Sequence, residues 1–178
     1  MQKIEIEFQL EPTDIEAWYL YQLDTVKAYR YQYWVTAVAA SGLCAVYVGQ
    51  WAGSTLISAA AAVAGFGAGW YGARVTLRSS LRAVARERAK GPASAAEFGA
   101  HQLSLDASGI LEIGPATQHK HDWKAVEGLF ESIGHLFVRV AGAAAYVIPK
   151  RAFVTEAGMV AFRSAFIEAT TNRATPDR

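Results

Sequence analysis

The sequence predicts an α+β membrane protein, in which a two-helix transmembrane hairpin precedes a small antiparallel sheet closed by a C-terminal helix. The formal net charge of +1 conceals a strong segregation of charge along the chain. No Asp, Glu, Lys or Arg occurs from Tyr31 to Ala73. This uncharged run is about twice the ~20 residues that cross a hydrocarbon core of ~30 Å. After residue 97 the pattern changes to short alternating segments that are typical of strands.

The uncharged run divides at residues 49–54, where two glycines and a serine indicate a turn. We therefore expect spans at residues 31–48 and 55–73, with aromatic side chains at their ends as in an interfacial belt. Lys27 and Arg30 precede the first span, and a basic helix at residues 74–90 follows the second. The positive-inside rule then places both termini in the cytoplasm, in a multi-pass protein of the cell inner membrane.

Residues 1–30 predict a strand followed by a capped helix. Ile4, Ile6, Phe8 and Leu10 alternate with polar residues, as in a strand with one buried face. Such a strand needs a partner, so we expect it to complete the C-terminal sheet. Thr13 with Glu16 three positions later predicts a capping box. Without an intervening Pro or Gly, that helix is expected to run unbroken into the first span.

Residues 91–97 are expected to form a linker, residues 98–170 an α+β domain and residues 171–178 a tail. A hairpin is predicted around the turn at residues 106–109, with further strands at residues 123–130, 136–140 and 145–148. Gly142 is assigned to the turn between the last two strands. Thr155 is expected to cap a final helix that buries Met159, Phe162 and Phe166 on one face.

Two strings in this domain carry a resemblance to a known family. Residues 123–127 read Trp-Lys-Ala-Val-Glu, and residues 148–153 read Ile-Pro-Lys-Arg-Ala-Phe. With the order of strands and helix, they resemble the C-terminal domain of the YcxB-like family of bacterial membrane proteins. The resemblance implies a strand and helix leading into two membrane spans, then a pleckstrin-homology-like sheet with a closing helix. It implies no established activity.

Three sets of residues are candidates for contacts. Lys150 and Arg151 are expected to face solvent, either as plain surface residues or as a binding site for an anionic headgroup or an acidic partner. Basic residues at four-residue spacing are expected to contact lipid headgroups and to set the topology; they are Arg74, Arg78, Arg82, Arg86 and Lys90. Small residues at the same spacing predict close packing of the two spans; they are Ala37, Ser41, Ala45, Gly49, Ala61, Gly65, Gly69 and Ala73.

The sequence favours neither a metal site nor an enzyme. Residues 119–122 are expected to form a polar turn before Trp123. As a strand they would place His119 and His121 on one face, but zinc requires further ligands. We therefore predict no metal and no cofactor. The sequence contains none of the common nucleophile, phosphate-loop or metalloprotease motifs, and no catalytic residue is assigned.

We interpret the chain as a membrane-anchored cytoplasmic binding or regulatory module. Its expected partners are the lipid bilayer and a protein or an anionic lipid. Nucleic acid is not expected, because no aromatic residue interleaves with the basic helix to stack on bases. Two alternatives stay open: an oligomeric channel or transport accessory protein, and then a membrane-associated enzyme. The sequence does not give the oligomeric state.

Overall fold

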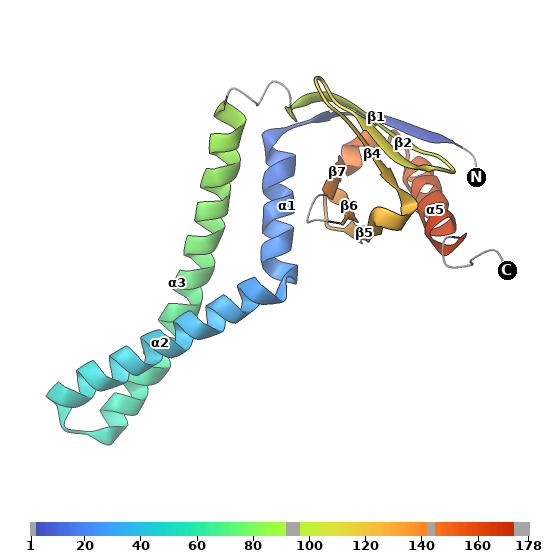
Figure 1. Cartoon of the computed structure of the whole chain (residues 1–178). Coiled ribbons are helices and arrows are strands. Elements are labelled where there is room, and N and C mark those ends of the chain that lie inside the picture. Colours follow the sequence, from blue (N-terminus) through green and yellow to red (C-terminus); the bar gives the residue numbers. More distant parts are fainter. Residues whose placement is uncertain (1–2, 92–96, 142–144, 173–178) are drawn as a thin grey trace. The chain divides into compact units, whose positions relative to one another are not determined.

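The computed structural model describes residues 3–91, 97–141 and 145–172 (Figure 1). The chain divides into two compact units. The first joins Met1–Trp18 to Ala85–Arg178, and the second is Tyr19–Val84. Helices α1 (Pro12–Thr25) and α3 (Thr55–Lys90) continue from one unit into the other. We describe each unit separately.

The first unit contains a four-stranded antiparallel sheet in the order β1-β2-β3-β4. Its strands are β1 (Ile4–Leu10), β2 (Gly99–Leu105), β3 (Gly109–Ile113) and β4 (Gln118–Asp122). Strand β1 pairs with β2 along its whole length, and Ile6 lies opposite Leu103. The period-2 pattern places Phe8, Leu103 and Leu105 in the core. The N-terminal strand therefore completes this sheet, as its alternation predicted.

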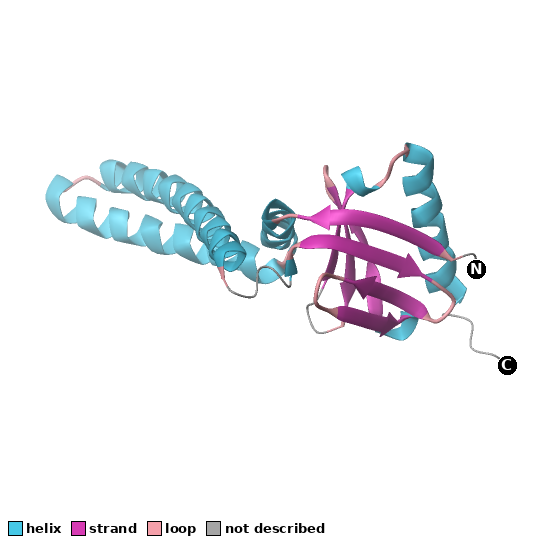
Figure 2. Cartoon of the chain, turned by 90° about the horizontal axis from the view of Figure 1, so that it is seen from above, coloured by secondary structure: helices cyan, strands magenta, loops and turns pink. Residues whose placement is uncertain are grey.

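A second antiparallel sheet has three strands in the order β5-β6-β7. Its strands are β5 (Val126–Glu131), β6 (His135–Val140) and β7 (Ala145–Pro149). Strand β7 also contacts β1 of the first sheet. Figure 2 shows the strands of both sheets gathered in one body with helix α5 (Glu156–Asn172) beside them. The fold class is α+β, as predicted.

Helix α5 begins where the sequence indicated. The Thr155 hydroxyl accepts a hydrogen bond from the backbone N–H of Gly158 at 3.1 Å, which satisfies one unpaired donor of the first turn. Phe162 and Phe166 are buried at the expected four-residue spacing, whereas Met159 is partly exposed. Trp123 packs edge-on against Phe166, with the ring centroids 5.6 Å apart. These contacts hold α5 to the sheets.

The second unit contains helix α2 (Lys27–Ala52) and most of α3. Gly53 separates them with φ 61°, a left-handed conformation that glycine adopts without strain. Gly65 marks a close approach of the helices: a Cβ there would lie 2.7 Å from Cys44 Sγ and 2.8 Å from the Ala40 carbonyl oxygen. Both helices are long and apolar enough to cross a membrane, and only 6% of each apolar window is buried.

Four sequence predictions of local structure were wrong. Glu11, not Thr13, precedes the first helical residue, and Asp14 accepts a hydrogen bond from the Glu11 N–H at 2.7 Å. The N-terminal helix does not continue into α2, because Val26 is extended with ψ 122°. The Thr25 hydroxyl donates to the Tyr21 carbonyl, a bond that bends helices, and Thr25 and Val26 are both β-branched.

Residues 118–122 form strand β4 rather than a polar turn. Residues 123–125 form the single-turn 3-10 helix η1 (Trp123–Ala125), so the strand expected from residue 123 begins at Val126. Strand β4 pairs only with β3 in its sheet. An edge strand tolerates polar side chains on both faces, and alternation therefore gave no signal. Gly142 and most of the expected linker lie outside the described residues.

Candidate functional site

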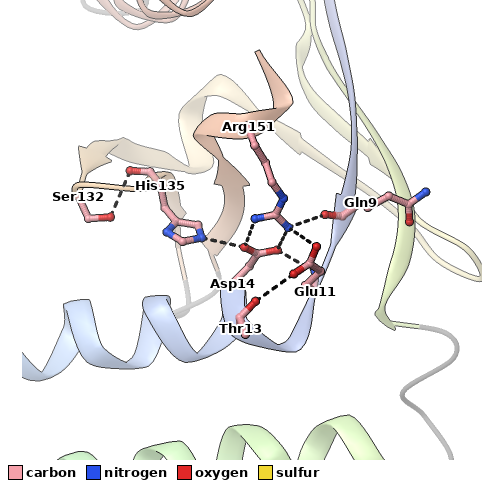
Figure 3. Close-up of polar contacts among 7 residues, drawn as sticks. All are labelled: Gln9, Glu11, Thr13, Asp14, Ser132, His135 and Arg151. Carbon is pink, nitrogen blue, oxygen red and sulfur yellow. Dashed lines mark hydrogen bonds and ion pairs between the residues drawn. The ribbon is translucent and has the colours of Figure 1, made fainter. Parts of the chain in front are cut away.

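Arg151 joins the end of the second sheet to the segment that leads into α1. It lies in the single-turn 3-10 helix η2 (Lys150–Ala152), directly after Pro149 ends β7. Its guanidinium donates to both carboxylate oxygens of Asp14, at 2.8 and 2.7 Å, and to the Gln9 carbonyl at 3.0 Å (Figure 3). Such bidentate pairing fixes orientation as well as distance. Residues 137 positions apart in the chain are thus joined.

Asp14 is the buried centre of this cluster. Its carboxylate is 1% exposed, whereas the Arg151 side chain is 46% exposed. His135, from β6, places Nε2 2.8 Å from Asp14 Oδ1 and stacks its ring on Phe137. Together with the Glu11 N–H, these groups give the buried carboxylate a full set of donors. We call Asp14, His135 and Arg151 the carboxylate clasp.

The clasp keeps Asp14 ionised. Burial raises the pKa of the carboxyl group, but hydrogen bonds from His135, Arg151 and the Glu11 backbone outweigh it and lower the pKa to about 2. Asp14 is therefore charged at any physiological pH. The Ser132 hydroxyl lies close to His135 but donates to its main-chain carbonyl at 3.4 Å, not to its ring (Figure 3). The geometry is that of a structural ion pair rather than an activated nucleophile.

The two predicted binding residues thus have different environments. The Lys150 ammonium pairs with Glu131 at 2.5 Å, and Arg163 from α5 pairs with the same carboxylate at 2.6 Å. Beside them, Ile133 in the β5–β6 turn and Val154 before α5 are both fully exposed. The Lys150 N–H donates to the Gly134 carbonyl, which holds the turn and η2 together. Lys150 therefore lies on an outer surface, and Arg151 belongs to the clasp.

The predicted basic series lies along α3. Arg74 and Arg78 both pair with Asp24 of α1, at 3.5 and 3.1 Å. Arg82, Arg86 and Lys90 continue the series as exposed residues. Near the C-terminal end of α3, Arg88 pairs with Glu97 at 2.8 Å.

The predicted small residues are all buried or half-buried within the hairpin. Ala37 is fully buried, and a Cβ at Gly69 would lie 2.7 Å from the Ala40 Cβ. Gly49 approaches Ser58 across the loop, with 3.1 Å from its ideal Cβ to the Ser58 Oγ. At Ala37, Gly49, Gly65 and Gly69 the rows thus lie where α2 and α3 approach each other.

Two histidines of the first sheet, His101 and His121, form hydrogen bonds. His121 Nδ1 bonds the hydroxyl of Tyr146 across the two sheets. His101 is buried, with Nδ1 3.1 Å from Glu112 Oε1 and Nε2 2.9 Å from the Glu97 carbonyl. Among the residues that the structure describes, no group of three His, Cys, Asp or Glu side chains could hold a metal ion.

Sequence reasoning missed Asp14, His135 and His101. His101 had a usable signal, because it precedes Leu103 and Leu105 at the inward positions of β2. Asp14 and His135 had none, because they meet only through the pairing of distant segments. Their roles depend on the tertiary fold.

Comparison with protein families identifies part of the chain. The model of the YcxB-like protein family matches residues 105–166. The matched segment runs from the end of β2 into α5 and contains both strings that carried the resemblance, so the resemblance is confirmed. No curated protein matches the chain. No solved structure matches it.

Proposed function

Because residues 105–166 form a YcxB-like domain, we propose that the chain is a membrane-anchored binding module whose folded domain lies on the cytoplasmic side. The pairing of β1 with β2 carries this proposal. Strand β1 precedes the apolar hairpin, and β2 follows it, yet the two strands form one antiparallel ladder. Chain segments that fold together must lie on the same side of a bilayer. An even number of spans between them satisfies this requirement.

The exposed surface of the hairpin supports membrane insertion. Large apolar side chains such as Leu43, Leu56 and Val63 are more than 70% exposed within the two apolar helices. A soluble protein rarely exposes apolar surface over two whole helices. Lipid would cover these side chains, and the basic residues that flank the helices would then face the cytoplasm.

The order of four antiparallel strands, then three, then one helix is compatible with the pleckstrin-homology-like sheet that the family resemblance implies. The fully exposed Ile133 precedes Gly134, whose carbonyl accepts a hydrogen bond from the Lys150 N–H, and the fully exposed Val154 follows η2. We propose that this surface, defined by Ile133, Lys150 and Val154, contacts a protein partner. An apolar centre with charged neighbours is a common composition for such contacts.

Site-specific photo-crosslinking in native membranes tests this function. A photoreactive side chain at Ile133 or Val154 should capture one recurrent protein, and the same group at lipid-exposed Val63 should not. Adding Lys150→Glu should weaken the capture from Ile133 without removing the protein from the membrane. Capture of the chain itself from all three positions would instead favour the oligomeric channel. Capture of lipid alone at Ile133 would refute a protein-binding surface.

A further inference from the structure

We propose that Arg74 and Arg78 form a binding site for the phosphate group of an anionic membrane lipid, with Asp24 holding their guanidinium groups together. This proposal rests on the insertion of the hairpin into a bilayer, which is part of the proposed function, and it assigns a ligand to one end of the hairpin. The three residues belong to the same compact unit, Tyr19–Val84. The bend at Val26 separates α1, which carries Asp24, from the apolar helix α2.

The position of the cluster along the chain favours lipid as the ligand. The uncharged run ends at Ala73, so Arg74 is the first charged residue after the second span. Arg78 follows one helical turn later, on nearly the same face of α3. Phosphate groups of a bilayer lie just outside its hydrocarbon core, at the depth where the first charge of a spanning helix is found.

The cluster has many hydrogen-bond donors and few acceptors. Two guanidinium groups supply about ten N–H donors, and the Asp24 carboxylate supplies two oxygens. Arg78 Nη2 lies 3.3 and 3.1 Å from those oxygens, and Arg74 Nη2 lies 3.5 Å from one of them. Among the described residues, three buried side-chain atoms have no hydrogen-bond partner, and two of them, Arg78 Nε and the Tyr33 hydroxyl, belong to this unit. An added ligand with several acceptor oxygens would meet this excess of donors.

Charge favours an anion. Within Tyr19–Val84 the charged residues are Asp24, Lys27, Arg30, Arg74, Arg78 and Arg82, which give a net charge of +4. All of them lie outside the uncharged run and therefore at one end of the hairpin. The side chains of Arg74 and Arg78 are 45% and 37% exposed, so an incoming phosphate can reach their guanidinium groups. Arginine binds phosphate oxygens with two parallel N–H donors, which adds geometry to charge.

Asp24 gives the site its shape. Without the carboxylate, two like charges one turn apart would repel each other and spread. With it, both guanidinium groups face one point and retain an excess positive charge. A lipid phosphate can then bridge them from the exposed side. A free acidic peptide would offer carboxylates without the acyl chains that the apolar helices can accommodate.

The test compares lipid selectivity among variants of the full chain in vesicles of phosphatidylcholine with trace spin-labelled phosphatidylglycerol. The wild type should bind phosphatidylglycerol in preference to phosphatidylcholine. Each arginine near an anionic surface contributes about a fivefold preference. Arg74→Gln/Arg78→Gln should therefore lose most of the selectivity, by about tenfold or more. The matched pair Arg86→Gln/Lys90→Gln removes equal charge from the same helix. Arg86 lies about 18 Å along α3 from Arg74, beyond the Debye length, so this pair should keep the selectivity within about twofold.

Four outcomes test the site, its ligand and the membrane anchor. Arg74→Lys/Arg78→Lys keeps the charge but lacks the paired N–H donors, so its selectivity should fall between that of the wild type and that of the Gln pair. Full wild-type selectivity in the Lys pair would overturn the site, because charge alone would then account for the binding. If both Gln pairs lost the same selectivity, net charge alone would explain the binding and the specific site would be overturned. Displacement of the labelled lipid by inorganic phosphate alone would assign the site to free phosphate and overturn the lipid proposal. Extraction of the wild type by alkaline carbonate would instead refute the membrane anchor itself.

Discussion

The structure predicts a much larger loss of stability for Arg151→Ala than the sequence alone does. As a solvent-facing residue, Arg151 would contribute within about 0.5 kcal/mol, as ordinary surface residues do. In the structure it donates two hydrogen bonds to a carboxylate that is 1% exposed. Its removal leaves a buried charge with His135 and the Glu11 N–H as the remaining donors. Such a loss destabilises a protein even when the lost partner is itself half-exposed.

The magnitude follows from the pKa of Asp14. A shift from 3.8 to about 2 corresponds to about 2 kcal/mol in favour of the ionised, folded form. Arg151 supplies two of the stabilising hydrogen bonds and an attractive charge, but it remains partly hydrated. We therefore expect Arg151→Ala to lower the unfolding free energy by about 2 kcal/mol, below the 3–5 kcal/mol of a fully buried pair.

The assay is urea unfolding of the full chain in detergent micelles, followed by amide hydrogen exchange of β2 and β6. With a urea dependence of about 1–2 kcal/mol per M, the midpoint should fall by about 1–2 M. Lys150→Ala is the matched control, because its partner Glu131 is 43% exposed, and a pair with such a carboxylate is worth about 0.5 kcal/mol. In a double-mutant cycle, Asp14→Asn should make Arg151→Ala much less costly. Equal midpoints for the Lys150 and Arg151 variants would refute the clasp.

Three further predictions follow from other parts of the fold. Acid should weaken the domain between about pH 4 and pH 2, because the lowered pKa of Asp14 contributes stability above its unfolded value that is lost as pH falls through about 2. In Asp14→Asn this loss, followed by circular dichroism, should be smaller, and the lowered pKa values of Asp106 and Glu131 account for what remains. Burial lowers the pKa of His101, but hydrogen bonds to Glu112 and the Glu97 carbonyl outweigh it and raise the pKa above 6.5. The contribution of His101 to stability is therefore complete below pH 6.5 and is lost as the pH rises through the raised pKa. His101→Gln should flatten this pH dependence of the unfolding free energy, and an unchanged pH profile would contradict the prediction. In the hairpin, Gly65→Ala should lower the unfolding free energy by about 1–3 kcal/mol in a detergent titration, because the new Cβ would clash with Cys44 and the Ala40 backbone. Gly67→Ala is the control: its Cβ meets nothing within 4 Å, so the change should be neutral or stabilising.

Local periodicity predicted the parts of the fold whose signals lie within a few residues. The alternation from Ile4 to Leu10 identified β1, and the four-residue spacing of Phe162 and Phe166 identified α5. The need to bury a lone amphipathic strand even predicted that β1 completes the sheet. These predictions succeeded because the burial of one face is encoded in the sequence itself.

Features that depend on distant contacts were not predicted. Nothing near Asp14 indicates that Arg151, 137 positions later, will complete its shell of donors. The bend at Val26 has no Pro or Gly to mark it, and polar β4 has no buried face to produce alternation. Lys150 and Arg151 are adjacent basic residues in the sequence, but Lys150 pairs with the exposed carboxylate of Glu131 and Arg151 with the buried carboxylate of Asp14.

The central claim is that one domain is assembled from chain segments that precede and follow a membrane hairpin in the sequence. Single cysteines at Gln9, Ser54 and Ser164, introduced with Cys44→Ala, test it by labelling spheroplasts with an impermeant maleimide. Gln9 in β1 and Ser164 in α5 are exposed positions of the same compact unit, and Ser54 lies in the loop between α2 and α3. We predict that Ser54 labels in intact spheroplasts and that Gln9 and Ser164 label only after permeabilisation. Labelling of Gln9 and Ser164 from opposite sides of the membrane would contradict the account.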